Sequence, residues 1–216
     1  MITIACALWA PNKHSFAFST HYTEADAEKL YRGFQRHLTL PFRFVCFTDT
    51  PRTFAEPILQ EPIEGEPNYS AVLQPFKLNE PMILVGLDTI VVGNCDHLAA
   101  YAIGGGKLAV PRDPFFPQTV CNGVTLAPGG HAWVWNDRPS DKTDMDWIRE
   151  IWQRGDAAVI DDLFPGQVVS FKGDVKKNGL SDETRIVYFH GVDKPHQLPH
   201  VGWIARHWHD NVKAAA

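Results

Sequence analysis

The first fifty residues contain two short apolar runs with an amphipathic segment between them, and this order constrains the fold more than any other feature. Residues 2–9, ITIACALW, and residues 42–48, FRFVCFT, have the length and apolar character of buried strands. The segment 23–38 opens with Thr23 at an N-cap position and then repeats large apolar residues at helical spacing. A strand-helix-strand unit predicts parallel strands joined by a right-handed crossover. We therefore expect an α/β fold that binds its ligands at the carboxyl edge of the sheet.

The composition is that of an ordinary globular protein. With 216 residues, of which 44% are hydrophobic and 21% charged, the chain is expected to form one domain without disorder or membrane insertion. A net charge of −5 and the lack of a basic run argue against general binding to nucleic acid. The sequence shows no secretory signal, no apolar run of membrane-spanning length and no Cys-x-x-Cys motif. We therefore expect a cytoplasmic protein.

Strand and helix patterns alternate along the rest of the chain. Proline and glutamate residues in 50–75 indicate a surface connection, and 111–146 is expected to be mostly irregular. Helices are expected near 76–78 and at 95–102 and 144–154, and strands at 82–93, 107–111, 119–126, 167–171 and 185–190.

Residues 82–93, MILVGLDTIVVG, place one carboxylate, Asp88, inside an apolar run. An ionised carboxylate among apolar residues is costly unless it is paired or bound to a metal. Asp88 therefore either caps a turn, which is the commoner case, or holds a metal or substrate at the carboxyl end of the strand. Asp144 and Asp146 are similarly ambiguous, because carboxylates at a helix start ordinarily serve as caps. His190, at the end of an expected strand, could simply be a hydrogen-bonded histidine.

Several short motifs follow one another in an order typical of one enzyme family. The chain contains GLDTIVVG at 86–93, CNGV at 121–124, DMD at 144–146 and YFHGVDKPH at 188–196, with supporting stretches at 30–49 and 202–208. In these motifs the chain resembles glycosyltransferase family 8, whose members share the nucleotide-sugar-binding GT-A fold. The resemblance implies a mixed central sheet flanked by helices in a single domain, 1–216. It also implies a nucleotide-binding half, 1–93, and a half that contacts the donor sugar and the acceptor, 94–216.

The resemblance implies a reaction as well. A sugar would move from a nucleotide sugar, most commonly a UDP-sugar, to the hydroxyl of a glycan, lipid, protein or small molecule, with retention of the anomeric configuration. The departing diphosphate needs positive charge, which Mn²⁺ or Mg²⁺ on Asp88 and His190 would supply, with Lys194 adding a point charge. Mn²⁺ suits a mixed oxygen and nitrogen donor set better than Mg²⁺ does. Asp144, Asp146 and Lys194 are the implied catalytic residues, with Asp144 near the donor sugar. The implied donor contacts are Leu8, Trp9, Tyr22, Thr48, Asp49, Lys77, Asp88, Asn122, Gly191 and Lys194.

Three positions depart from the family pattern. Gly86 replaces the first aspartate of the Asp-x-Asp motif, so the motif, Gly86-Leu87-Asp88, is incomplete. Tyr188 stands where the family has a histidine, and His190 lies two residues further along the same strand face. Met145 stands where the family has a glutamine.

Two other functions stay open at this point. A nucleotidyltransferase of the same fold would attack the α-phosphate and release pyrophosphate. A nucleotide-sugar-binding protein that has lost catalysis would account for Gly86 and Met145. A zinc site at His200, His207 and His209 is disfavoured, because their spacing differs from that of His-Glu-x-x-His; a surface helix with docked tryptophans is expected there instead.

Overall fold

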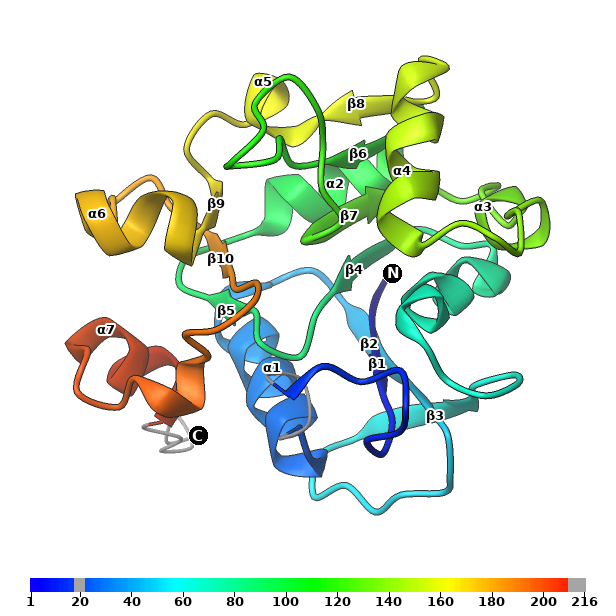
Figure 1. Ribbon diagram of the computed structural model, residues 1–216. Coiled ribbons are helices and arrows are strands. Elements are labelled where there is room, and N and C mark those ends of the chain that lie inside the picture. The colour runs from blue at the N-terminus through cyan, green and yellow to red at the C-terminus, as the bar shows by residue number, and fades with distance from the viewer. Residues whose placement is uncertain (18–21, 210–216) are drawn as a thin grey trace.

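The crossover unit predicted near the N-terminus is present in the computed structural model, which describes residues 1–17 and 22–209 (Figure 1). β1 (Ile2–Leu8) and β2 (Phe42–Thr48) pair in parallel along their full lengths, and α1 (Glu24–His37) connects them. The backbone N–H of Thr23, the N-cap residue of α1, donates to the Asp26 carboxylate at 2.9 Å.

In the described residues the strands form two sheets, and most of the helices are short. The other strands are β3 (Ile58–Pro62), β4 (Met82–Val85), β5 (Ile90–Val91), β6 (Leu108–Val110), β7 (Val124–Ala127), β8 (Ala157–Val159), β9 (Val168–Ser170) and β10 (Ile186–Tyr188). The other α-helices are α2 (Asp96–Gly104), α3 (Trp133–Asn136), α4 (Asp144–Gln153), α5 (Ile160–Leu163), α6 (Lys176–Asn178) and α7 (Gly202–Ile204). Segments with 3₁₀- or π-helical geometry within the described residues include η2 (Tyr69–Leu78), η3 (Phe171–Val175), η4 (Pro195–Gln197) and η5 (Ala205–His209).

The central sheet is mixed, as predicted. Its seven strands lie in the order β3-β2-β1-β4-β7-β6-β8, and a second sheet has the order β5-β10-β9. β3, β2, β1 and β4 pair in parallel, whereas β7 runs antiparallel to both β4 and β6. The expectation of an α/β fold with a mixed central sheet is confirmed.

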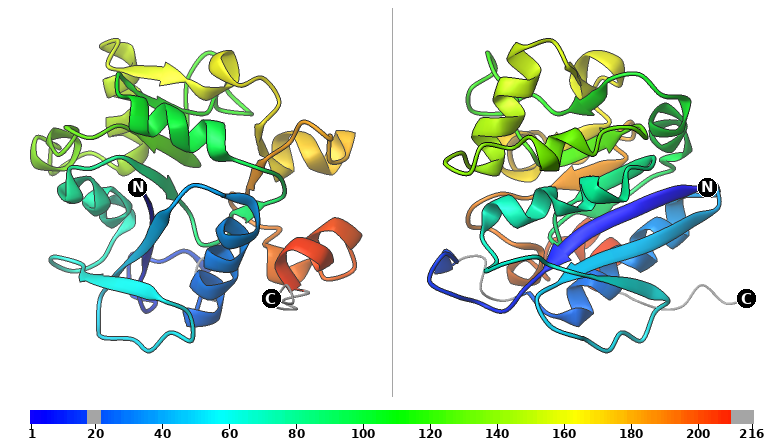
Figure 2. Two further views of the ribbon diagram at one scale, coloured as in Figure 1. Left: turned by 180° about the vertical axis from the view of Figure 1, so that it is seen from behind. Right: turned by 90° about the vertical axis from the view of Figure 1, so that its right-hand side faces the viewer.

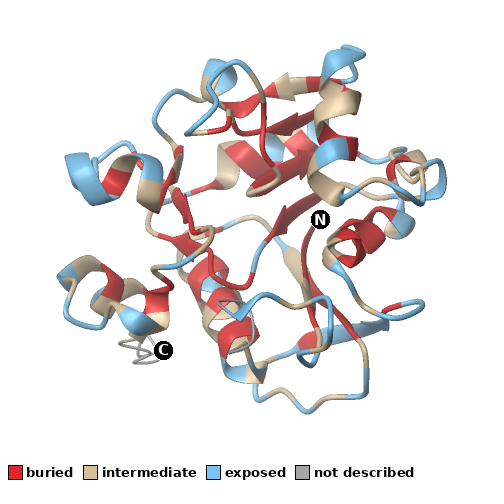
Figure 3. Cartoon of the chain, in the orientation of Figure 1, coloured by how far each residue is buried: buried red, intermediate tan, exposed pale blue. Residues whose placement is uncertain are grey.

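Helices cover both faces of the central sheet. Because successive side chains of a strand point to opposite faces, each strand contributes to a core on either side of the sheet. Ile83 and Val85 of β4 belong to a core shared with α1 and α2. Met82 and Leu84 belong to a second core, shared with η2, α3 and α4. Figure 3 shows the central strands as buried, with the exposed residues on loops and outer helix surfaces.

The apolar run 82–93, predicted as one strand, is two strands in different sheets. β4 ends at Val85, and β5 pairs antiparallel with β10. Between them a turn is closed by the Thr89 N–H, which donates to the Gly86 carbonyl at 3.1 Å. Asp88 therefore lies in a turn that links the two sheets, at the carboxyl end of β4.

Other element boundaries also differ from the prediction. The segment 50–75 contains the edge strand β3, whose side chains after Ile58 are exposed, and it contains most of η2. The strand predicted at 119–126 starts only at Val124, with an isolated bridge between Arg112 and Val120 before it. α3, β8 and α5 are too short to leave a clear periodic pattern.

The C-terminal segments α7 and η5 lie beside α1 (Figure 2). Trp208 is buried there with Ile90, Phe171 and Ile204, which agrees with the expected docking of a tryptophan on the core. Within residues 1–17 and 22–209, no helix combines the length and apolar character that a membrane crossing requires.

Candidate active site

A cleft of about 430 Å³ lies at the carboxyl edge of β1 and β4. Its volume falls within the roughly 300–1,000 Å³ typical of small-molecule sites. The ends of β1, β4 and β10, the segment before β7 and the first turn of α4 contribute its walls. β7 runs antiparallel to β4, so Val124 at the start of β7 pairs with Val85 at the end of β4. The segment before β7 therefore meets the end of β4 at the cleft.

Asp88 lines this cleft and accepts two hydrogen bonds on one carboxylate oxygen. The Tyr22 hydroxyl donates to Asp88 Oδ2 at 2.7 Å, and the Lys194 ammonium forms a short ion pair with the same oxygen. Asp88 is 8% exposed and Lys194 is 3% exposed, so water screens this pair far less than a surface pair. Burial, followed by the charge of Asp88, raises the pKa of Tyr22, which therefore remains a protonated donor.

Gly86 adjoins the other carboxylate oxygen of Asp88. A Cβ atom on Gly86 would lie 2.8 Å from Asp88 Oδ1, closer than an ordinary van der Waals contact. A second aspartate at this position would therefore require the Asp88 side chain to move. Within the motif Gly86-Leu87-Asp88, Asp88 is the single carboxylate.

His190 lines the cleft beside the lysine. Its Nδ1 lies 3.3 Å from the Ser170 hydroxyl oxygen, and its ring packs edge-on against Phe115 with centroids 5.1 Å apart. Burial, and then the positive charges of Lys172 and Lys194, lower the pKa of His190, so the imidazole is neutral at pH 7. Its buried Nε2 has no hydrogen-bond partner among the described residues. A polar ligand in the cleft could satisfy this nitrogen.

Asp144 projects from the first turn of α4 into the same cleft. The Asn122 side-chain amide donates to Asp144 Oδ2 at 3.3 Å, and Asn122 is oriented in turn by the Thr125 hydroxyl at 3.0 Å. Burial raises the pKa of Asp144, although the hydrogen bond from Asn122 opposes the shift. Met145 also lines the cleft.

The end of β1 forms another wall of the cleft. Leu8 and Trp9 line the cleft there, and the Asp49 carboxylate accepts a hydrogen bond from the next backbone N–H, that of Ala10, at 2.9 Å. Asp49 does not itself line the cleft but forms an ion pair with Arg52 at 2.8 Å. It thus fixes the backbone beside Trp9.

The structure brings together most of the residues singled out in the sequence. Leu8, Trp9, Tyr22, Asp88, Asn122, Asp144, His190, Gly191 and Lys194 all line the cleft.

Thr48, Asp146 and Lys77, like Asp49, lie outside the lining. The Thr48 carbonyl accepts a hydrogen bond from Ile63. Asp146 lies in the first turn of α4, where its backbone N–H donates to the hydroxyl of the N-cap residue Thr143 and its carboxylate accepts a hydrogen bond from that hydroxyl. Lys77 forms an ion pair with Glu64.

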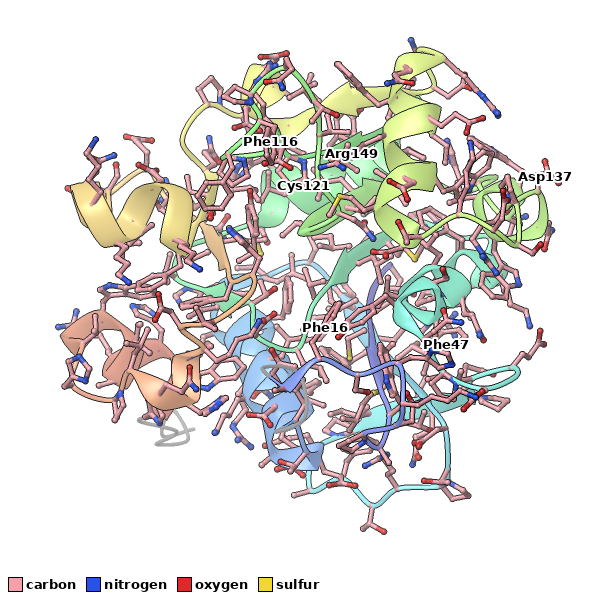
Figure 4. The ribbon with its side chains drawn as sticks, viewed as in Figure 1. Phe16, Phe47, Phe116, Cys121, Asp137 and Arg149 are labelled. Atoms are coloured by element: carbon pink, nitrogen blue, oxygen red, sulfur yellow. The ribbon has the colours of Figure 1, made fainter. Side chains whose placement is uncertain are left out.

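The loop after β6 is a part of the site that the sequence pattern did not reveal. Asp113 Oδ1 accepts hydrogen bonds from the backbone N–H groups of Phe115 and Phe116 at 2.9 and 3.0 Å. Its other oxygen pairs with Arg149 of α4 at 2.9 Å. Figure 4 labels Phe116, Cys121 and Arg149 in this part of the molecule. It also labels Phe16, which lies on the loop after β1 and, like Cys121, lines the cleft. The only hint was the Asp-Pro turn signal at 113–114.

The residues around Asp88 do not fit a divalent metal centre. The described residues contain no group of three or more histidine, cysteine, aspartate or glutamate side chains placed to share a metal ion. Asp88 Oδ2 is already engaged by Lys194 and Tyr22, and Gly86 provides no ligand. Mg²⁺ takes six oxygen ligands, and most of them would have to come from outside the protein.

Comparison with known proteins places the fold among glycosyltransferases. No family model matches the sequence, and no curated protein matches it either. The structure is similar to the glycosyltransferase GlyE of Streptococcus pneumoniae, with a TM-score of 0.61 and 13% identity over 96% of this chain. This chain spans 61% of the GlyE chain. It is also similar to the galactosyltransferase LgtC in complex with donor and acceptor sugar analogues, with a TM-score of 0.56 and 10% identity over 98% of both chains.

A third similar structure is the bifunctional glycosyltransferase WbbM, with a TM-score of 0.59 and 9% identity over 90% of this chain and 46% of that one. At such low identities these similarities establish the fold, which is GT-A-like, and leave the chemistry to be argued from the site.

Proposed function

We propose that this protein is a glycosyltransferase that moves a sugar from a nucleotide sugar, most simply a UDP-sugar, to an acceptor hydroxyl. The observation that carries the proposal is the convergence of Asp88, Asp144 and Lys194 in one cleft, from three distant segments of the chain. The cleft lies at the carboxyl edge of a GT-A-like sheet, where α/β folds bind nucleotides.

Each group has a part in this proposal. The nucleobase would lie against Leu8 and Trp9 at the end of β1, and the diphosphate would lie by the buried Lys194 ammonium. Positive charge fixed at this point stabilises the charge that develops on the diphosphate as the glycosidic bond breaks. Asp144, which also lines the cleft, would accept hydrogen bonds from donor-sugar hydroxyls and stabilise the positive charge that develops at the anomeric carbon. We propose retention of the anomeric configuration on the basis of the sequence resemblance.

A nucleotide screen tests the donor class. Purified protein is heated with UDP, GDP, UDP-glucose, UDP-galactose or GDP-mannose, each at about 100-fold over the expected dissociation constant. Binding to the native state then adds about 2.7 kcal/mol to stability, which raises the melting temperature measurably. We expect a shift with UDP and at least one UDP-sugar. Absence of a shift with every nucleotide would refute the proposal.

Product analysis separates the transferase from the nucleotidyltransferase. Glycosyl transfer or donor hydrolysis releases UDP, whereas nucleotidyl transfer releases pyrophosphate. We expect UDP in incubations with the donor that gives the largest thermal shift. A parallel incubation with UTP and a sugar 1-phosphate tests the other reaction. Release of pyrophosphate there, with no UDP from the UDP-sugar, would assign the cleft to nucleotidyl transfer.

A further inference from the structure

The cleft contains a buried ammonium held by the carboxylate that was expected to hold a metal. We infer that the Lys194 ammonium, fixed by Asp88 and Tyr22, is the resident cation for the donor diphosphate, so that donor binding needs no divalent metal. This inference rests on the proposed function, because it assigns a role within the donor site.

The charges around Asp88 balance without a metal. One carboxylate and one ammonium have zero net charge, as do two carboxylates around a divalent cation. Gly86 removes one negative charge from the motif, and the ammonium matches the single carboxylate that remains. A divalent cation added at Asp88 would lie beside the Lys194 ammonium, where the low local dielectric strengthens repulsion between like charges.

The ligands available to a metal around Asp88 lead to the same conclusion. Asp88 Oδ2 accepts from both Lys194 and Tyr22, so a metal at this oxygen would have to displace two donors. Asp88 Oδ1 adjoins Gly86, which offers no side-chain ligand. The buried Nε2 of the neutral His190 imidazole could bind a metal through its lone pair. In the tautomer that carries the proton on Nε2, the same atom would donate a hydrogen bond to a phosphate oxygen.

The backbone around Lys194 holds the ammonium in place. Gly191 and Asp193 adopt positive φ angles of 62° and 70°, which bend the chain sharply after β10. The Lys194 N–H then donates to the Gln197 side chain at 2.9 Å, and Pro195 begins η4. Lys194 therefore reaches Asp88 from an ordered turn, and its ammonium costs little reorganisation when a diphosphate binds.

Titration calorimetry with UDP tests this inference directly. UDP is titrated into the wild-type protein in EDTA and, separately, in excess Mn²⁺. We expect dissociation constants that agree within about threefold. Binding at least tenfold tighter in Mn²⁺ than in EDTA would overturn the inference while leaving the proposed function intact. Absence of UDP binding under both conditions would overturn both.

Substitution of the lysine gives a second, independent readout. Lys194→Met keeps an unbranched side chain one atom shorter and removes the charge. We expect UDP affinity to fall about 10- to 100-fold in EDTA and in Mn²⁺ alike, as for loss of one charge-assisted hydrogen bond. Lys177→Met, on the exposed surface of α6, removes the same net charge and should bind UDP like the wild type. Unchanged affinity in a folded Lys194→Met protein would contradict the assignment. If that variant does not fold, the wild-type comparison of EDTA with Mn²⁺ decides alone.

Discussion

Asp88 shows how one residue can satisfy two interpretations of the same sequence. It lies in a turn, as the commoner interpretation holds, and the turn places its carboxylate in the cleft. Its partner is an ammonium more than a hundred residues away in the chain, a contact that local sequence cannot show. The expected metal pair, Asp88 with His190, stays a prediction, and we propose Lys194 as the cation instead.

The charge balance at Asp88 predicts how a metal site could be created. The double variant Gly86→Asp/Lys194→Met exchanges the ammonium for a second carboxylate. We expect UDP binding by this variant to become dependent on Mn²⁺, with affinity at least tenfold weaker in EDTA. The single variant Lys194→Met, which has one carboxylate, is the matched control and should respond weakly to Mn²⁺. Calorimetry with both proteins checks this, and a double variant insensitive to Mn²⁺ would count against the charge argument.

Substitutions at Asp144 and at Asp146 are predicted to have different effects, although the residues are two positions apart. Asp144→Asn should lower kcat for sugar transfer about 10²- to 10³-fold and leave UDP affinity unchanged, because UDP lacks the sugar that Asp144 would contact. Asp146→Asn should instead remove a negative charge from the first turn of α4, at a cost of about 0.3–1 kcal/mol in stability, with little effect on kcat. Equal loss of kcat in both variants would contradict the placement of Asp144 at the sugar.

The pH dependence of transfer follows from the burial of Asp144. Burial raises its pKa, so the ionised form is lost at a higher pH than for an exposed aspartate. If ionised Asp144 acts in the reaction, kcat should decline on the acid side with an apparent pKa above the ordinary aspartate range. A profile of kcat against pH that stays flat through this range would argue that Asp144 acts uncharged.

At the scale of elements, the sequence predicted the strands that lead into the site better than the strands around it. β1, α1, β2 and β4 have long or regular apolar patterns, and they were recognised. The join of β4 to β5 was missed because both strands are buried, in different sheets, so their apolar residues form one continuous run. β3 was missed because it is an exposed edge strand that contains proline and glutamate.

The same limits explain which site residues were found. Leu8 and Thr48 are register partners on neighbouring strands, yet Leu8 lines the cleft and Thr48 does not, because the cleft is centred between β1 and β4. Strand order depends on contacts distant in sequence, which a local pattern does not encode. The motif containing Lys194 was recognised, whereas the loop of Asp113 and Phe115 follows no motif.

The contact between β10 and the segment before β7 predicts a packing defect at Gly123. A Cβ there would lie 2.4 Å from the buried Tyr188 ring, so the ring or the backbone would have to shift. Gly123→Ala should therefore lower the free energy of unfolding by about 1–3 kcal/mol. Gly104→Ala at the end of α2 meets no atom within 4 Å and should be neutral or slightly stabilising. Urea denaturation of both variants measures the difference, and equal stability would refute the contact.

At the scale of the whole molecule, the packing of the C-terminal segment on α1 is predicted to depend on pH. His37 lies against His207 with ring centroids 5.5 Å apart, and burial lowers the pKa of His37 to about 4. The folded state thus binds the proton more weakly than the unfolded state, whose value is near 6.5. Stability from this site is complete above about pH 6.5 and declines as the pH falls towards 4. The melting temperature of His37→Asn should therefore fall less than that of the wild type between pH 6.5 and 4.5. Equal falls in the two proteins would contradict this.

The whole arrangement makes one claim that a single structure can test. In a crystal of the UDP complex grown in EDTA, we predict the uracil beside Leu8 and Trp9 and a diphosphate oxygen within hydrogen-bond distance of Lys194 Nζ. UDP bound with its diphosphate away from Lys194, or density for UDP only outside the cleft, would contradict the proposed donor site.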